Sequence, residues 1–233
     1  MCARSLVRKV SGLIHPVGWQ YIAICMTAAI VGSLAWKGMF CVGTAAALWC
    51  AYFFRDPRRV TPVRPGLLIS PADGKITGIA KVVPPAEIGL GDAEVYKISI
   101  FLSVFDVHIN RVPIDSTVEA KVYFPGKHIN ACLDKASVDN ERLAMRLRLV
   151  DGRAIGVVQI AGLIARRIVS WVAEGQPVKA GERFGMIKFG SRADVYLPEG
   201  VSPLVTLGQY MAGGETVLAD LQSNEPPRVG EVR

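Results

Sequence analysis

A glycine followed by a serine, Gly190 and Ser191, interrupts the strand-like run FGMIKFGSRADVYLP. A serine after a glycine occurs in many turns, so the pair indicates no chemistry by itself. The chain also has three histidines, His15, His108 and His128, and imidazole suits proton transfer near neutral pH. A lone histidine is more often structural than catalytic, so these residues must be interpreted through their surroundings.

Several distinctive short sequence motifs accompany these residues. In order along the chain they are SPADG (70–74), FDVHINRVP (105–113), PGK (125–127), LDKAS (133–137), NER (140–142) and QIAGLIARRI (159–168). Together with the run around Ser191, they resemble the short form of phosphatidylserine decarboxylase, a self-processing, pyruvoyl-dependent proenzyme. The resemblance covers essentially the whole chain after Arg55.

The resemblance identifies the bond between Gly190 and Ser191 as the site of self-cleavage. The serine hydroxyl attacks the carbonyl of Gly190, and glycine, which has no Cβ, neither obstructs this approach nor resists a strained peptide. Loss of the Ser191 α-proton then expels the Gly190 carboxylate, and hydrolysis of the resulting dehydroalanine gives a pyruvoyl group and ammonia. We expect a β chain 1–190 and an α chain 191–233 that remain together as a heterodimer. Association into a higher oligomer is also compatible with the sequence.

The resemblance further implies that the pyruvoyl carbonyl derived from Ser191 forms a Schiff base with the amine of phosphatidylserine. The electrons released with carbon dioxide then delocalise into the imine and the adjacent amide, which is electron-sink chemistry. Protonation and hydrolysis release phosphatidylethanolamine. The expected enzyme is a carboxy-lyase of phospholipid biosynthesis whose cofactor is the covalent pyruvoyl group, with no metal and no pyridoxal phosphate.

His108 is the only histidine inside one of these family motifs. The resemblance therefore makes it the candidate acid and base, with Asp73 and Asp106 as orienting carboxylates. SPADG is also typical of a simple tight turn. In the longer members of the family the processing histidine lies three residues further on, where this chain has Arg111. A triad of Asp73, His108 and Ser191 is thus a geometric hypothesis.

Four cationic residues inside the family motifs are candidates for binding the carboxylate or phosphate of the lipid. Guanidinium and ammonium groups suit both anions. Structural ion pairs or solvated charges are the alternative for each of them. The four residues are Lys127, Arg142, Arg166 and Arg167.

The apolar excess of the chain lies before Arg55. Hydrophobic residues make up 51% of the sequence, and segments 17–36 and 38–54, separated by Lys37, are each about as long as a membrane-crossing helix. Basic residues flank the pair on both outer sides: Arg4, Arg8 and Lys9 before it, and Arg55, Arg58, Arg59 and Arg64 after it. The positive-inside rule then predicts a hairpin in the cell membrane with the catalytic domain on the cytoplasmic side.

Two alternatives to a spanning hairpin exist. A cleaved signal peptide fits less well, because the apolar region is too long and arginines follow it instead of a small-residue cleavage site. A re-entrant hairpin within one leaflet stays open, since the second segment is short for a span.

The net charge of +7 suits an anionic membrane or a nucleic acid. No nucleic-acid-binding signature is present, whereas basic clusters adjoin the apolar segments, so we expect a membrane partner and no nucleic acid. The five cysteines include no CxxC pair, which indicates neither a disulfide framework nor a metal site.

After Arg59 the sequence consists of short β-branched runs separated by glycine, proline and aspartate. We expect a mainly antiparallel, β-sandwich-like catalytic domain over 55–233, with hairpins like those of biotinyl and lipoyl domains on both sides of Ser191. It follows a basic segment, 1–16, and the helical hairpin, 17–54. One helical piece is predicted at Ser137–Met145, where a capping residue precedes Glu141.

Three other functions remain open. Another seryl lipid, such as archaetidylserine, has the same head group and would use the same motifs. A pyruvoyl decarboxylase of a soluble amino acid would not need the hairpin. In a membrane-anchored β-sandwich binding module, Gly190 and Ser191 would only form a turn.

Overall fold

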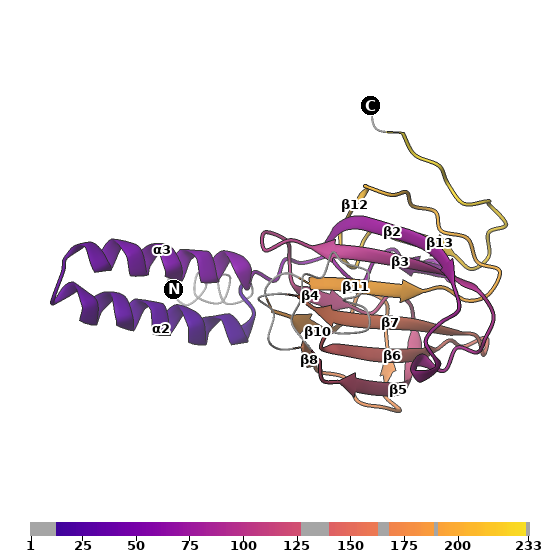
Figure 1. Ribbon diagram of the computed structural model, residues 1–233, viewed down its shortest axis with the longest axis horizontal. Helices are drawn as coiled ribbons and strands as arrows, with labels where there is room; N and C mark the ends of the chain where they lie inside the picture. Colours follow the sequence, from indigo (N-terminus) through magenta and orange to yellow (C-terminus); the bar gives the residue numbers. More distant parts are fainter. Residues whose placement is uncertain (1–12, 127–139, 163–167, 189–190, 232–233) are drawn as a thin grey trace, which may run out of the picture. The chain divides into compact units, whose positions relative to one another are not determined.

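The computed structural model describes residues 13–126, 140–162, 168–188 and 191–231 (Figure 1). The chain divides into two compact units after Arg58. The helices α2 and α3 belong to the first unit and all of the strands to the second. Of the described residues, 37% lie in strands and 19% in helices, which confirms the expected mainly β class with an N-terminal helical pair.

The first unit is a pair of apolar helices, α2 (Pro16–Ser33) and α3 (Gly38–Phe53). They pack closely, because a Cβ at Gly43 would lie 2.3 Å from the Cβ of Ala29, and small residues of this kind let two helix backbones approach. By length and composition, α2 could cross a membrane, whereas α3 has 16 residues and is shorter. Helix α2 is thus weak evidence of membrane association.

The second unit is built on an eight-stranded sheet with the order β12-β2-β3-β11-β7-β6-β5-β9. All neighbouring strands in it are antiparallel. The strands are β2 (Gly74–Val82), β3 (Val95–Leu102), β5 (Ser116–Phe124), β6 (Arg142–Arg148), β7 (Ala154–Ala161), β9 (Pro177–Val178), β11 (Ser191–Tyr196) and β12 (Tyr210–Met211). Strand β11 therefore lies in the interior of the sheet, between β3 and β7.

Two smaller sheets and one short helix complete this unit. Strands β1 (Leu67–Ile69) and β13 (Val217–Asp220) form an antiparallel pair. A three-stranded sheet has the order β4-β10-β8 and consists of β4 (Ile109–Arg111), β10 (Arg183–Ile187) and β8 (Ile168–Ser170). The 3-10 helix η1 spans Ala86–Ile88.

Both faces of the eight-stranded sheet are buried near β11. One face, here called the inner face, packs into the main hydrophobic core together with residues of the two smaller sheets: Leu68, Ile98, Ile100, Leu102, Val157, Phe184, Ala193, Val195 and Leu218. The opposite, outer face packs in a second cluster with η1: Ile88, Val95, Ala144, Val158, Ile160 and Tyr196. Alternation of side chains along β11 thus sends successive residues into two different cores.

The helix predicted at Ser137–Met145 is wrong over its described residues, because β6 begins at Arg142 and continues to Arg148; residues 137–139 lie outside the described residues. Pairing with β5 and β7 gives this segment backbone hydrogen bonds on both of its sides. Leu143, Met145 and Leu147 are buried on one face of the strand, and Ala144 is buried on the other. Tertiary pairing has outweighed the local capping signal.

Candidate active site

Ser191 is the first residue of β11, and its backbone partners are Leu102 on β3 and Ala161 on β7. Directly opposite residues of antiparallel strands share a face, so Ser191 lies on the inner face with Leu102. Its side chain is fully buried. Within the described part of the chain, the hydroxyl oxygen has no hydrogen-bond partner. A nucleophilic oxygen in this state is unusual for a structural serine. Gly190, the residue before it, lies outside the described residues.

The three-stranded sheet packs against the large sheet and brings His108 to the end where Ser191 lies. The backbone N–H of Ile187 on β10 donates to the carbonyl of His108 at 3.3 Å, and Ile187 packs with Ala161, the partner of Ser191. In the view of Figure 1, β4, β10 and β8 lie at the end of the large sheet where β11 begins. His108 and Ser191 therefore belong to facing layers at one end of the domain.

The His108 ring has a defined tautomer. Its Nδ1 lies 2.9 Å from the backbone carbonyl oxygen of Asp106, and a carbonyl only accepts hydrogen bonds, so Nδ1 carries the proton. The neutral ring then has its basic lone pair on Nε2. The side chain is 1% exposed, which keeps this nitrogen inside the domain.

Asp106 uses its backbone rather than its carboxylate on His108. The carboxylate accepts the backbone N–H of Ser103 at 2.7 Å and so closes the turn that connects β3 to β4. The sequence predicted Asp106 as an orienting carboxylate, but in the structure it is the backbone carbonyl of Asp106 that contacts the His108 ring.

Asp73 is bound to two groups other than His108. Its carboxylate lies 2.6 Å from the guanidinium of Arg59 and accepts the backbone N–H of Gly213 at 2.7 Å. Burial raises the pKa of Asp73 above its usual range, and Arg59 and the Gly213 amide offset this only in part. Asp73 thus holds the SPADG turn against two other segments of the second unit.

The SPADG turn is also attached to β4. The Pro71 carbonyl accepts the backbone N–H of Arg111 at 2.8 Å and the side-chain amide of Asn110 at 3.4 Å. Asp73 is therefore connected to the strand that follows His108, although it does not hydrogen-bond to the histidine itself.

The sequence analysis did not single out two polar residues inside the family motifs, Asn110 and Gln159. Gln159 on β7 donates its side-chain amide to Asn110 Oδ1 at 2.8 Å, and both side chains are buried. Each lies in a strand, β4 or β7, whose neighbouring residues are also buried. A glutamine within the buried strand AIGVVQIA is the signal that could have identified this pair.

Of the predicted lipid-binding cations, only Arg142 lies among the described residues. Its guanidinium pairs with Glu87 at 3.0 Å and lies over the ring of Phe124 at 4.3 Å. Arg142 is paired with Ile160 across the strands, which places it on the outer face, opposite to Ser191. Lys127, Arg166 and Arg167 fall outside the described residues.

The outer face of β11 carries a buried ion pair. Arg192 and Asp194 are 2.8 Å apart, with side chains 4% and 1% exposed. Tyr196, further along this face, has its pKa raised, mainly by burial. The three outer-face residues of β11 are therefore all held in buried surroundings.

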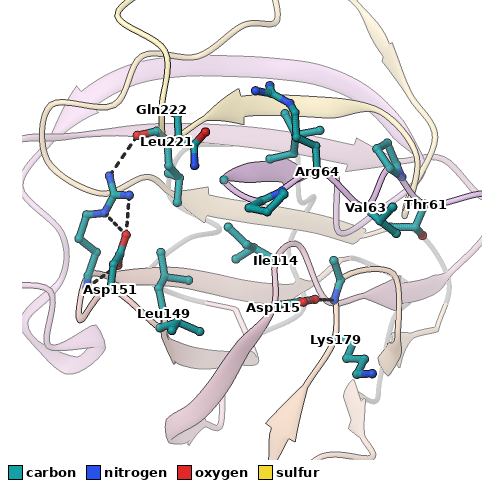
Figure 2. A pocket seen from close by; sticks show the side chains of 17 residues that line it. Thr61, Val63, Arg64, Ile114, Asp115, Leu149, Asp151, Lys179, Leu221 and Gln222 are labelled. Atoms are coloured by element: carbon teal, nitrogen blue, oxygen red, sulfur yellow. Dashed lines mark hydrogen bonds and ion pairs between the residues drawn. The ribbon is translucent and has the colours of Figure 1, made fainter.

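A cavity of about 660 Å³ lies elsewhere in the second unit (Figure 2). Val63, Ile114, Leu149 and Lys179 are among its lining residues. Leu149 follows the end of β6, whereas Ser191 is level with the residue just before that strand, about 26 Å away at the usual rise per residue,. This cavity is separate from the surroundings of Ser191.

Among the described residues, no group of three or more His, Cys, Asp or Glu side chains is arranged to hold a metal ion. The buried polar groups of the inner face and of the layer packed on it include the amides of Gln159 and Asn110 and the imidazole of His108. These groups can move or hold protons and can bind an amine.

Comparison with known proteins shows a close similarity along most of the chain. Residues 46–219 match the family model described as phosphatidylserine decarboxylase. The phosphatidylserine decarboxylase proenzyme of Cereibacter sphaeroides is 57% identical over 94% of this chain and 94% of its own length. The proenzyme of Paramagnetospirillum magneticum is 53% identical over 94% and 92%, and that of Ruegeria pomeroyi is 54% identical over 89% and 95%.

Proposed function

The chain belongs to the phosphatidylserine decarboxylase family, and we propose that its reactive centre forms by self-cleavage between Gly190 and Ser191. It is an enzyme that converts phosphatidylserine to phosphatidylethanolamine and carbon dioxide. The observation that carries the proposal is the Ser191 hydroxyl, which is fully buried in an interior strand and has no partner among the described residues.

The processing steps use atoms of the chain itself. The Ser191 hydroxyl attacks the carbonyl carbon of residue 190, so that an ester replaces the amide and the nitrogen of Ser191 becomes a free amine. Loss of the Ser191 α-proton breaks the bond to the ester oxygen and releases the carboxylate of Gly190. Water then replaces the nitrogen, which leaves as ammonia, and a pyruvoyl group remains at the start of the smaller chain.

The surroundings of Ser191 fit such a group. Apolar partners, Leu102 and Ala161, lie on both sides of it, and buried polar atoms lie one step further along the inner face. When present, the pyruvoyl group supplies the electron sink for decarboxylation of an amine-bearing substrate. The protein's part is to exclude water, orient the substrate and move protons.

The two products of cleavage should remain one folded body. Strand β11 would belong to the smaller chain, yet it pairs along its whole length with β3 and β7 of the larger one. Strands β12 and β13 likewise pair with β2 and β1. Separation would break an eight-stranded sheet and expose its core, which is why a stable heterodimer follows.

His108 is proposed as the base that activates Ser191 and as a proton donor in lipid turnover. The Asp106 carbonyl fixes the proton on Nδ1, so the basic lone pair of the neutral ring, which the acid and base role needs, lies on Nε2. Asp73 is proposed to act indirectly, because it holds the SPADG turn, whose Pro71 carbonyl binds the strand after His108.

The lipid anion is proposed to bind at the same end of the domain. Arg166 and Arg167 come soon after Ala161, the residue opposite Ser191, and Lys127 comes soon after the end of β5. Arg142 is the least favoured of the predicted cations, since its guanidinium is engaged with Glu87 on the outer face.

The apolar helices are proposed to attach the enzyme to the cell membrane, with the catalytic unit on the cytoplasmic side and close to an anionic lipid surface. The charge of +7 supports this arrangement,.

Intact-mass analysis of the purified protein tests the self-cleavage directly. We expect two chains that meet between residues 190 and 191, with the smaller one lacking a free N-terminal amine. A single uncleaved chain that still decarboxylates phosphatidylserine would overturn the proposal.

A further inference from the structure

The inner face of the large sheet holds a second buried polar atom with no partner among the described residues. This atom is the side-chain oxygen Oε1 of Gln159, a residue that is 1% exposed. Buried amide oxygens nearly always accept a hydrogen bond. The self-cleavage of Ser191 accounts for the unpartnered serine oxygen, but it leaves the oxygen of Gln159 unexplained.

The orientation of this amide is fixed by a chain of hydrogen bonds. The carbonyl of Pro71 can only accept, so the group of Asn110 that contacts it at 3.4 Å is the NH2 group,. Asn110 Oδ1 therefore faces Gln159 and accepts from Nε2 at 2.8 Å. It follows that Gln159 Oε1 is directed away from Asn110.

Gln159 lies next to Ser191 on the same face. It is paired with Ala193 on β11, while Ser191 is paired with Ala161, two residues further along β7. Diagonal neighbours of this kind are about 7 Å apart between their backbones, within reach of a long side chain. A carboxamide on β7 can therefore face the space beside residue 191.

Gly185 on β10 makes room for the amide. A Cβ at this position would lie 3.0 Å from Gln159 Nε2 and 2.5 Å from the carbonyl oxygen of Val169. The absence of a side chain at Gly185 allows β10 to pack directly over the Gln159 amide. The amide is thus held from both layers.

We propose that Gln159 Oε1 binds the amine of the serine head group, and that Asn110 is the positioning residue that directs it. This inference rests on the proposed reactive centre at residue 191, since the amine must approach that residue to react. An oxygen that only accepts attracts the amine, which carries protons, and repels the carboxylate and the phosphate of the same lipid. Gln159 therefore sets which end of the head group faces residue 191.

Two substitutions separate this role from a structural one. Gln159→Met and Gln159→Glu both remove the hydrogen bond donated to Asn110. Only Gln159→Glu keeps an oxygen at the end of the side chain. A role in recognising the amine predicts different behaviour for the two variants, whereas a purely structural role predicts the same defect in both.

The measurement is equilibrium binding of two short-chain lipids to the full-length, self-cleaved protein in detergent. Dihexanoyl phosphatidylethanolamine carries the amine, and dihexanoyl phosphatidylglycerol has the same phosphate and acyl chains without it. We expect Gln159→Met to weaken binding of the first about tenfold or more, the usual scale for a hydrogen bond to a charged group, and to leave the second nearly unchanged. Gln159→Glu should keep the preference for the amine.

Three outcomes would overturn the inference. They are an equal loss for both lipids in both variants, an unchanged preference in Gln159→Met, and accumulation of an uncleaved, hydroxylamine-sensitive ester, which would mean that the oxygen serves the amine of Ser191 during processing. Labelling of the smaller wild-type chain with phenylhydrazine tests the reactive carbonyl separately. If that labelling fails, the proposed centre at residue 191 is wrong, whatever Gln159 does.

Discussion

Ser191 and Leu102 are direct partners across β11 and β3, so the bond proposed for cleavage lies at the beginning of a strand that is interior to the sheet. A serine on the exposed tip of a hairpin would be open to water, whereas this hydroxyl is shielded by the strands on both of its sides. The relationship explains how a chain can be cut and keep its fold, and it makes the serine itself the first target for mutation.

Ser191→Ala should give only an uncleaved, inactive chain, because alanine has no hydroxyl to attack the preceding carbonyl. Ser99→Ala is the matched control, since Ser99 is also buried, in the neighbouring strand, opposite Asp194. The control should be cleaved normally. Mass spectrometry of both purified proteins checks this, and two normal fragments from Ser191→Ala would place the cut elsewhere.

His108→Ala should slow self-cleavage about a hundredfold to ten-thousandfold, the usual cost of losing a general base. The fraction that is cleaved should also decarboxylate phosphatidylserine slowly. A time course of chain cleavage and a single-turnover assay separate the two steps. His15→Ala, which changes a histidine at the start of α2, should leave both rates unaltered. Near-normal rates in His108→Ala would remove this residue from the mechanism.

Asp73→Asn should impair the same step as His108→Ala, because the proposed effect of Asp73 reaches the histidine through the SPADG turn and β4. The double variant should then be little worse than His108→Ala alone, as expected for residues that act as a unit. Cleavage rates of the two single variants and the double variant form the cycle. Fully multiplied defects would show that Asp73 acts on a separate step.

Asp73 and Asp220 should affect the pH dependence of stability in opposite directions. Burial raises the pKa of Asp73, so its favourable contribution is present below the unfolded pKa and is lost as the pH rises through the folded pKa. The Gln222 amide and then Arg64 lower the pKa of Asp220. The contribution of Asp220 is therefore present above its unfolded pKa and is lost as the pH falls through the folded pKa.

Chemical unfolding of the wild type and of each asparagine variant, from about pH 6 to about pH 3, measures this difference across the usual titration range of aspartate. On acidification, the stability of the wild type relative to Asp220→Asn should decrease, and its stability relative to Asp73→Asn should increase. The same trend in both pairs would contradict the raised pKa of Asp73.

A truncated chain that begins at Arg55 should leave the membrane fraction yet still cleave itself. The residues proposed for processing all lie in the second unit, and Arg59, the partner of Asp73, is retained. Membrane flotation and mass spectrometry measure attachment and cleavage separately. If the truncated protein unfolds cooperatively but stays uncleaved, the helices take part in building the site.

The sequence alone was sufficient to predict the β class of the catalytic unit, the helical pair and the family. These depend on local composition and on short sequence motifs in a fixed order. Gly190, Ser191 and His108 were predicted as site residues on the same basis, and their roles stay predictions. The same local reasoning predicted a helix where β6 lies, since a capping signal acts over one turn whereas strand pairing joins residues far apart in the chain.

Only the tertiary structure decided how the polar residues are distributed between the layers. It directs Asp73 to Arg59 and Gly213 and not to His108, gives the histidine a backbone carbonyl in place of a carboxylate, and places Arg142 on the outer face. It also brings Asn110 and Gln159, which are 49 residues apart, into one hydrogen bond beside residue 191. Hydrogen bonds depend on distance and direction between groups from different strands, and a linear sequence specifies neither until the sheets have formed.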